Sequence, residues 1–282
     1  GDSACSLPPH TLSTEIIDEI KRQTKAIALE LGVIGLMNAQ FAVSEPDVYL
    51  IEVNPRASRT IPFVAKAKDI PVANLATQVM LGKKLSQIEI SHSRENFVAV
   101  KEAVFPFTRF PNADLLLGPE MLSTGEVMGW DREFNMAYAK AQIAAGMDLP
   151  LEGRILFAIG DPSQREESKP LVLEAIRLGY EVCALDDTAS AWGKESELLE
   201  YIWSEHEAIT AIRAGEVKLL VSIDTRKGST DGATSLRRAG LEAGLPYFTR
   251  LTNVTALIGA LTSLSKRQKP SVNALQRAES IS

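Results

Sequence analysis

VYLIEVNPRASRT, residues 48–60, joins a strand-forming segment to a cluster of polar groups. Its first half is rich in apolar and β-branched residues, which favour a buried strand. Glu52 and Asn54 are two residues apart, so on a strand both side chains point to the same face. Pro55 has no backbone N–H to donate and ends the strand. The stretch therefore predicts a strand that ends in a polar turn.

The polar residues of this turn suit metal-assisted phosphoryl transfer. Carboxylate and amide oxygens, as in Glu52 and Asn54, are hard ligands that suit Mg²⁺ or Mn²⁺. Arg56 and Arg59 follow at once, and planar guanidinium groups match phosphate and carboxylate oxygens. A strand end with a solvated charge cluster is the better interpretation of Glu-x-Asn taken alone. The whole run favours a phosphoryl-transfer site.

A second strand is expected directly before this one. Residues 35–43 read as a strand and 44–47, Ser-Glu-Pro-Asp, as a turn, so the two strands should form a β-hairpin. Gln40 would lie near Glu52 if the register brings them together across the pair. Three oxygen ligands would then share one face, although Gln40 taken alone is better explained as an exposed strand position.

The rest of the first half contains one unusual strand. Charges at Lys101 and Glu102 interrupt the centre of a predicted strand over 97–107, where they are either on its wet face or functional. The other elements expected here are a helix that starts after Thr11 or Ser13 and closes at Gly32, helices within 61–82, and a helix around 131–146.

Strands and helices alternate after a linker at 147–153. This alternation predicts a doubly wound parallel sheet, and it places a domain boundary near 150, between domains 1–150 and 151–282. The expected strands are 154–160, 181–185, 217–223 and 246–249, and the expected helices are 168–178, 194–203, 206–214, 230–243 and 254–264.

The carboxyl ends of these strands form a second candidate site, because ligands of such sheets bind there. The ends are rich in hydroxyls and amides, with Arg226, Lys227 and Arg250 close by. That composition suits a small anion such as a nucleotide phosphate. Ordinary polar loops are the equal alternative.

Composition excludes several classes of protein. The 282 residues are 45% hydrophobic and 23% charged, as in a globular protein, and the net charge of −6 with no strong basic face argues against a nucleic-acid partner. Neither a signal peptide nor an apolar run near the ~18 residues of a membrane span is present. Cys5 and Cys183 are far apart in the sequence and are expected to be reduced, as in the cytoplasm.

Five segments resemble the large chain of carbamoyl-phosphate synthetase. They are Gly1–Pro9, GLMNAQFAV at 35–43, LIEVNPRASRTIPFVAKA at 50–67, KEAVFPF at 101–107 and LGPEMLSTGEVMG at 117–129. The resemblance is dense over 1–145. It is looser over 153–282, which resembles the methylglyoxal-synthase-like allosteric domain of that family.

The resemblance implies an α/β fold in two parts: a partial ATP-grasp α+β domain, then a doubly wound methylglyoxal-synthase-like domain. It implies that this chain is the C-terminal part of a longer one and belongs to its second half, which phosphorylates carbamate. The chain would begin inside the second ATP-grasp unit. The activity would be ATP-dependent synthesis of carbamoyl phosphate from bicarbonate and glutamine-derived ammonia, for arginine and pyrimidine biosynthesis. The partner would be a small glutaminase subunit within an oligomer, and the cofactors ATP and Mg²⁺ or Mn²⁺, with K⁺ as a further ion.

Matching positions imply roles for individual residues. Gln40, Glu52 and Asn54 would be metal ligands, with Glu52 bridging two ions, while Arg56 and Arg59 would steady the phosphoryl group and the carbamate. These are the roles that the residue chemistry already favours.

Effector sites are implied as well. Asp2 and Glu102 match carboxylates that hold the activator ornithine in some bacterial members, and Thr249 would reach the same site. A nucleotide phosphate would meet Thr188, Thr225, Arg226 and Lys227. Here the chain departs from the family: Gln164, Leu185, Asp224 and Arg226 stand where Lys, Thr, Asn and Thr are expected. This argues against a nucleotide effector, although Arg226 and Lys227 would suit an anion site that is built differently.

Two alternatives stay open. Biotin-dependent carboxylases also use a Glu-x-Asn-Pro-Arg strand, although Gly1–Pro9 and the second domain argue against them. The chain alone would otherwise be an inactive regulatory or scaffold fragment, because no Walker sequence or Gly-rich nucleotide loop supplies an adenine pocket.

Overall fold

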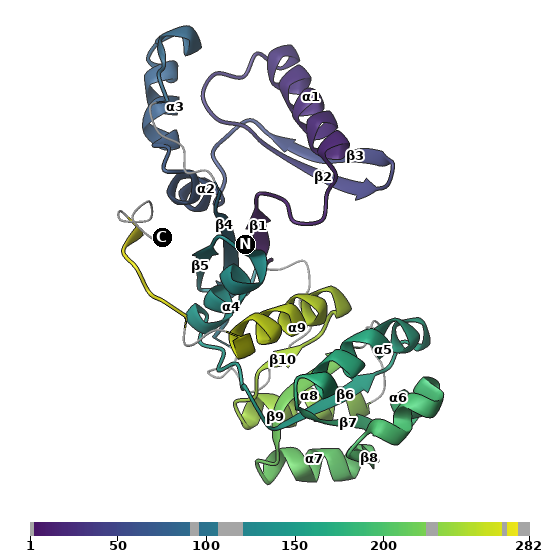
Figure 1. Ribbon diagram of the computed structural model, residues 1–282. Helices are drawn as coiled ribbons and strands as arrows, with labels where there is room; N and C mark the ends of the chain where they lie inside the picture. The colour runs from purple at the N-terminus through teal and green to yellow at the C-terminus, as the bar shows by residue number, and fades with distance from the viewer. Residues whose placement is uncertain (1–2, 91–95, 107–120, 224–230, 267–269, 276–282) are drawn as a thin grey trace. The chain divides into compact units, whose positions relative to one another are not determined.

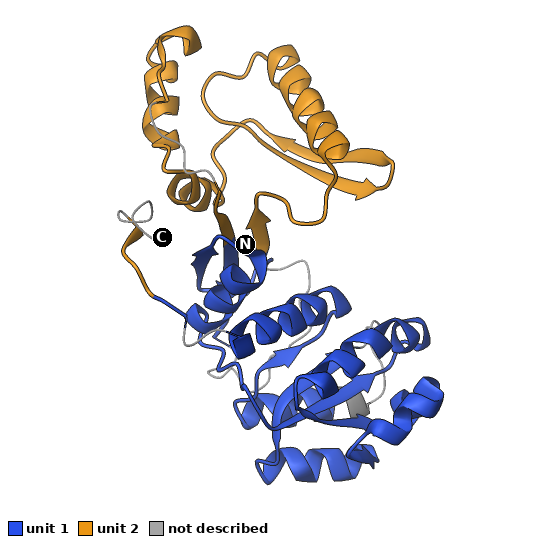
Figure 2. Cartoon of the chain, in the orientation of Figure 1, with its two compact units in different colours: residues 1–4, 100–271 blue, residues 5–99, 272–282 orange. Residues whose placement is uncertain are grey.

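The computed structural model describes residues 3–90, 96–106, 121–223, 231–266 and 270–275, with only the backbone given at 231–234. Contacts divide the chain into two compact units (Figure 2). We call residues 5–99 with 272–282 the hairpin unit, and residues 1–4 with 100–271 the sheet unit. The division falls inside a strand at Ala99–Val100, and the domain boundary near 150 stays a prediction.

The hairpin unit begins with a short strand and a capped helix. Helix α1 starts where predicted, because the Ser13 hydroxyl accepts a hydrogen bond from Ile16 N at 3.3 Å, and it ends before Gly32. The elements of this unit are β1 (Cys5–Leu7), α1 (Thr14–Glu30), β2 (Asn38–Ser44), β3 (Asp47–Asn54), α2 (Ile61–Lys68), α3 (Val72–Met80) and the 3₁₀ turn η1 (Leu85–Gln87). Strand β1 was not predicted from the sequence.

Strands β2 and β3 pair antiparallel, as the sequence predicts, but β3 is not the buried strand that its composition favours (Figure 1). Tyr49, Leu50 and Ile51 are 53%, 43% and 59% exposed. Within the described residues the sheet has only these two strands, and a two-stranded hairpin buries little surface by itself. The apolar pattern therefore predicted the strand correctly and its burial wrongly.

The sheet unit contains strands β4 (Val98–Val104) and β5 (Gly125–Asp131) and helix α4 (Phe134–Ala144). Strand β4 and helix α4 confirm predictions, whereas β5 was missed. Helix α4 lies against β5 at Gly129, where a Cβ atom would overlap the backbone of Ala137 and Ala141. Helix α4 also packs on the last helix of the unit, because Gly259 leaves room for Asn135. Both close contacts of α4 are possible because glycine has no side chain at these positions.

A five-stranded parallel sheet forms the rest of this unit. Its strand order, β10-β9-β6-β7-β8, reverses direction at β6 and confirms the predicted doubly wound sheet (Figure 1). The strands are β6 (Arg154–Ile159), β7 (Glu181–Leu185), β8 (Tyr201–Trp203), β9 (Val217–Ile223) and β10 (Tyr247–Phe248), and the helices are α5 (Pro162–Arg177), α6 (Asp186–Trp192), α7 (Glu205–Arg213), α8 (Asp231–Glu242) and α9 (Leu251–Lys266).

The helices group by face. Helix α5 packs with α6 and α9, and α7 packs with α8, so the two groups cover opposite sides of the sheet (Figure 1). Trp192 anchors the first group: it is fully buried, its Nε1 donates to Arg165 O at 2.8 Å, and its ring meets Phe157 edge-on at 5.9 Å. Among the described residues, no helix is both long and apolar enough to cross a bilayer.

Two predictions in this region were wrong. Residues 194–203 are not a helix: a 3₁₀ segment, η3 (Gly193–Leu198), leads into strand β8, because the aromatic and β-branched run Tyr201–Trp203 pairs with β7. Helix α5 begins at Pro162 rather than 168, since Asp161 caps it and proline is well suited to a first turn.

We expect Gly129→Ala to destabilise the sheet unit by about 3 kcal/mol, the upper end of ordinary overpacking, because the new methyl group would meet the backbone of α4. Urea unfolding followed by circular dichroism measures this. Gly125→Ala on the same strand meets no atom within 4 Å and should change stability by less than about 0.5 kcal/mol. Equal effects would contradict close packing of α4 on β5.

Candidate functional site

The first candidate site is an oxygen cluster on the hairpin. Gln40 is the register partner of Glu52, so their side chains share a face of the sheet, as the sequence suggested. Asn54 shares that face too, since its Nδ2 donates to Glu52 Oε1 at 3.0 Å. This bond leaves Asn54 Oδ1 to act as an acceptor. The structure therefore brings all three predicted metal ligands together.

The two predicted arginines follow at the end of β3. Arg56 N donates to Asn54 O at 2.8 Å, which turns the chain immediately after the strand, and Arg56 Nη1 donates to Ala57 O at 3.0 Å. Both Arg56 and Arg59 are exposed. Both arginines thus follow the oxygen cluster directly in the chain and have exposed side chains.

The donor set fits a hard divalent cation held jointly with a substrate. It offers one carboxylate, Glu52, and two amides, and the described residues contain no group of three or more His, Cys, Asp and Glu that could hold a metal. Mg²⁺ is commonly bound by one or two carboxylates plus substrate phosphates. The cluster therefore suits a metal that arrives with a phosphorylated ligand.

The second candidate site is a cavity of about 640 Å³ inside the sheet unit, a size typical of small-molecule sites. Glu102 on β4 and Thr249 after β10 both line it, so the structure brings these two predicted effector residues to one cavity. Asp2 lies outside the described residues, but its neighbour Ser3 lines the same cavity.

The charges at the centre of β4 are not on a wet face. Lys101 is 5% exposed, and its Nζ lies 2.9 Å from Glu126 Oε1. Glu102 points to the opposite face, where Gln142 Nε2 donates to its Oε2 at 2.6 Å. Burial raises the pKa of Glu102, although this bond and one from Ala103 N oppose the shift.

The sequence analysis missed Gln142 and Tyr138, which share the cavity wall with Glu102. The two residues are one turn apart on α4 and so lie on the same helix face. A polar pair at this spacing within an apolar helix was the signal that could have found them. Burial and the negative charge of Glu102 raise the pKa of Tyr138, so the phenol stays neutral.

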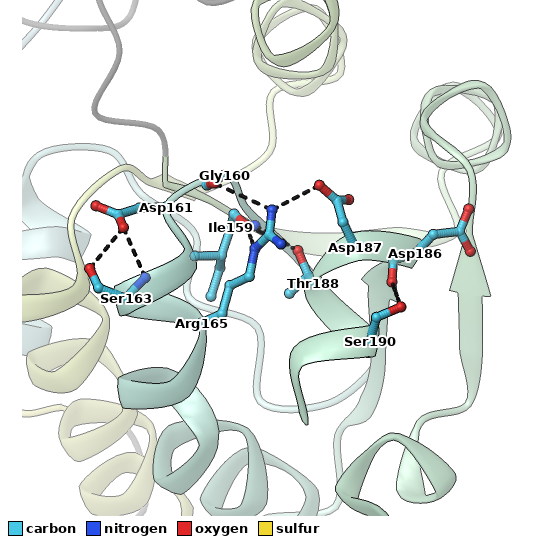
Figure 3. A network of polar contacts seen from close by, with 9 residues as sticks. All are labelled: Ile159, Gly160, Asp161, Ser163, Arg165, Asp186, Asp187, Thr188 and Ser190. Atoms are coloured by element: carbon cyan, nitrogen blue, oxygen red, sulfur yellow. Dashed lines mark hydrogen bonds and ion pairs between the residues drawn. The ribbon is translucent and has the colours of Figure 1, made fainter. Parts of the chain in front are cut away.

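The carboxyl ends of β6 and β7 form a polar network (Figure 3). Arg165 Nε donates to Ile159 O at 2.6 Å, and Arg165 Nη2 lies 2.8 Å from Asp187 Oδ2. Asp161 caps α5 by accepting from Ser163 N at 3.0 Å. The Thr188 hydroxyl, buried at 1% exposure, accepts from Ile159 N at 2.9 Å.

This network satisfies its own polar groups. The hydroxyls of Thr188, Ser163 and Ser190 each bond to protein, and the guanidinium of Arg165 is paired (Figure 3). The described residues at this edge therefore resemble ordinary polar loops more than an anion site. Three predicted nucleotide contacts, Thr225, Arg226 and Lys227, lie outside the described residues.

The chain was compared with known proteins. The family model described as "Carbamoyl-phosphate synthase L chain, ATP binding domain" matches residues 1–88. Three proteins named carbamoyl phosphate synthase large chain match far more of it. The one from Rhizobium meliloti (strain 1021) is 42% identical over 94% of this chain, that from Methanothermobacter thermautotrophicus 42% over 94%, and that from Rhodopirellula baltica 40% over 98%.

These matches confirm the resemblance that the sequence motifs indicate. They extend through the parallel sheet as well as the hairpin. The chain spans about a quarter of the length of these relatives, 24%, 26% and 26% respectively.

Glu102→Gln should make stability less dependent on pH. A carboxyl whose pKa is raised in the folded state favours folding below its unfolded pKa, and that contribution is lost as pH rises through the folded pKa. The variant should therefore match the wild type near pH 4 and exceed it at pH 8 in urea unfolding.

Glu126→Gln is the matched control. It makes the same substitution at a carboxylate that is paired, and so leaves the buried Lys101 ammonium without its charged partner. We expect a loss of about 2 kcal/mol at neutral pH. A Glu102→Gln variant that is less stable than the wild type at pH 8 would contradict the desolvated environment of Glu102.

Proposed function

We propose that this chain, a homologue of the carbamoyl phosphate synthase large chain, carries the metal-binding end of an ATP-dependent carbamate-phosphorylating site together with an effector domain. The observation that carries this proposal is the alignment of Gln40, Glu52 and Asn54 on one hairpin face. The family match over 1–88, which includes this hairpin, supports it. Because the matched family is carbamoyl-phosphate synthase, the match also favours this function over that of a biotin-dependent carboxylase.

The reaction joins a carbamate oxygen to the γ-phosphorus of ATP, and ADP leaves. A Mg²⁺ or Mn²⁺ bound with the nucleotide would neutralise phosphate charge there. Glu52, with Gln40 and Asn54, would hold that ion, and Glu52 would bridge two of them. Arg56 and Arg59 would orient carbamate and the transferring phosphoryl group, because guanidinium groups pair with both. Loss of such a charge clamp costs several kcal/mol of transition-state stabilisation.

The same proposal assigns a fold family to each part of the chain. Residues 1–150 would be the C-terminal part of an ATP-grasp domain, and residues 151–282 a methylglyoxal-synthase-like allosteric domain. The doubly wound parallel sheet is compatible with the second assignment.

The wider enzyme would use bicarbonate, glutamine-derived ammonia and ATP, with K⁺ as a further ion. A small glutaminase subunit would supply the ammonia within an oligomer. Carbamoyl phosphate would serve arginine and pyrimidine biosynthesis in the cytoplasm.

The cavity would hold an α,δ-diamine such as ornithine. Glu102 and Thr249 both line it, and Gln142 Nε2 holds Glu102 in place through its hydrogen bond. Asp2 would supply a second carboxylate. A nucleotide effector at Thr188, Thr225, Arg226 and Lys227 is less well supported, because the Thr188 hydroxyl is already bonded to Ile159.

We expect Glu52→Gln to weaken Mn²⁺ binding by the 282-residue chain at least tenfold, measured by water proton relaxation in the presence of ADP. Outer-shell changes alone cost about 10–100-fold at metal sites, and Glu52 is the single carboxylate of the set. Glu45→Gln removes an exposed carboxylate from the hairpin turn and should leave binding unchanged. Equal effects of the two variants would refute the ligand assignment.

The chain alone should not make ATP from carbamoyl phosphate and ADP. Residues 48–60 provide side chains suited to bind a metal ion and a phosphate group, but the sequence has no Walker motif or Gly-rich nucleotide loop. A coupled hexokinase assay measures ATP formation, with full-length synthetase as the positive control. Clear turnover by these 282 residues would show that they contain a complete active site.

A further inference from the structure

The carboxyl edge of the parallel sheet lies where a ligand would bind, but groups of the chain itself fill it. Strand order reverses at β6, and doubly wound sheets bind ligands outside the carboxyl ends of their strands at such a point. Two backbone donors here already bond within the protein. Ile159 N donates to the Thr188 hydroxyl at 2.9 Å, and Gly160 N donates to Ile223 O at 2.8 Å.

Arg165 places a positive charge over the end of β6. Its side chain is only 15% exposed. Its Nε donates to Ile159 O at 2.6 Å, and its Nη2 donates to Gly160 O at 3.3 Å (Figure 3). These two carbonyl groups fix the guanidinium in place, but they are neutral acceptors and leave its charge unpaired. A guanidinium held in this way is suited to bind a carboxylate or a phosphate.

Asp187 occupies the position that such an anion would take. It belongs to α6, whereas Arg165 belongs to α5, and its Oδ2 lies 2.8 Å from Arg165 Nη2 (Figure 3). The side chain of Asp187 is 68% exposed. Ion pairs with an exposed partner contribute little to stability. The fold therefore gains little from this contact, whereas the contact closes the guanidinium to other anions.

The neighbouring acidic residues do not share this position. Asp161 caps α5 by accepting a hydrogen bond from Ser163 N at 3.0 Å. The side chain of Asp186 is directed away from Arg165 in Figure 3. Both carboxylates add negative charge to the edge, but neither is paired with the guanidinium. Asp187 is thus the one of these three aspartates whose contact blocks Arg165.

We propose that Asp187 is an autoinhibitory residue, whose carboxylate takes the anion position of Arg165 and keeps small phosphate-bearing compounds from binding at the carboxyl edge. Loss of the Asp187 charge alone opens this position, because Arg165 keeps its two carbonyl contacts and stays in place. The role of Asp187 depends neither on the hairpin site nor on amine binding in the cavity, so the failure of those proposals would leave it standing.

The test is thermal unfolding of the full chain over a range of inorganic phosphate concentrations at constant ionic strength, before and after Asp187→Asn. Both chains also carry Arg56→Gln and Arg59→Gln, so that the hairpin arginines bind no phosphate. The rise in melting temperature with phosphate gives the dissociation constant. We expect Asp187→Asn to bind phosphate about fivefold more tightly, the largest factor that an ion pair with an exposed partner usually contributes.

Two further variants serve as controls. Asp187→Glu keeps the charge and should bind phosphate as weakly as the parent chain. Asp186→Asn removes the same charge from the next residue while Arg165 stays paired, so its affinity should change little. Equal gains in Asp186→Asn and Asp187→Asn would show that the overall charge of the edge excludes anions, which would overturn the proposal. The same conclusion would follow from an unchanged affinity in Asp187→Asn, or from a gain in Asp187→Glu that equals it.

Discussion

Strand β4 sets the arrangement of the sheet unit by alternating two charges across its faces. Lys101 is buried against Glu126 on one face, and Glu102 reaches the cavity from the other. A one-residue slip in this strand would exchange the two environments and leave a buried ammonium without its carboxylate. The ion pair thus fixes the register, and the register places the carboxylate at the cavity. Helix α4, held close by Gly129 and Gly259, completes the wall.

The two candidate sites differ in how firmly their groups are held. On the hairpin, Glu52, Arg56 and Arg59 are exposed side chains at the end of a two-stranded sheet. In the cavity, Glu102 and Gln142 are bonded to each other in a buried wall. The first geometry can adapt to a large anionic ligand, whereas the second suits recognition of a small molecule by fixed groups.

Local sequence patterns predicted most elements and the hairpin site, because cross-strand partners follow from a turn and an alternation. They predicted α1 from a cap at Thr11 or Ser13, and they allowed Gln40 to lie near Glu52 if the strand register paired them, as it does. They failed where contacts between distant parts of the chain decide the secondary structure or the burial of a residue. Tyr201–Trp203 is a strand because β7 lies beside it, and Leu50 remains 43% exposed although helix α1 contacts β3. Tyr138 and Gln142 form a recognisable polar pair on α4, but the bond from Gln142 to Glu102 depends on how α4 packs on the sheet.

The pairing of Arg165 with Asp187 has a consequence for any anion that approaches the carboxyl edge of the sheet. The carboxylate is tethered to the same fold as the guanidinium, at 2.8 Å, and so acts as a built-in competitor. Tethered groups compete at effective concentrations in the millimolar range. A phosphate compound would have to exceed that competition before it gained any affinity from Arg165. An anion that binds Arg165 at this edge must therefore displace Asp187 first.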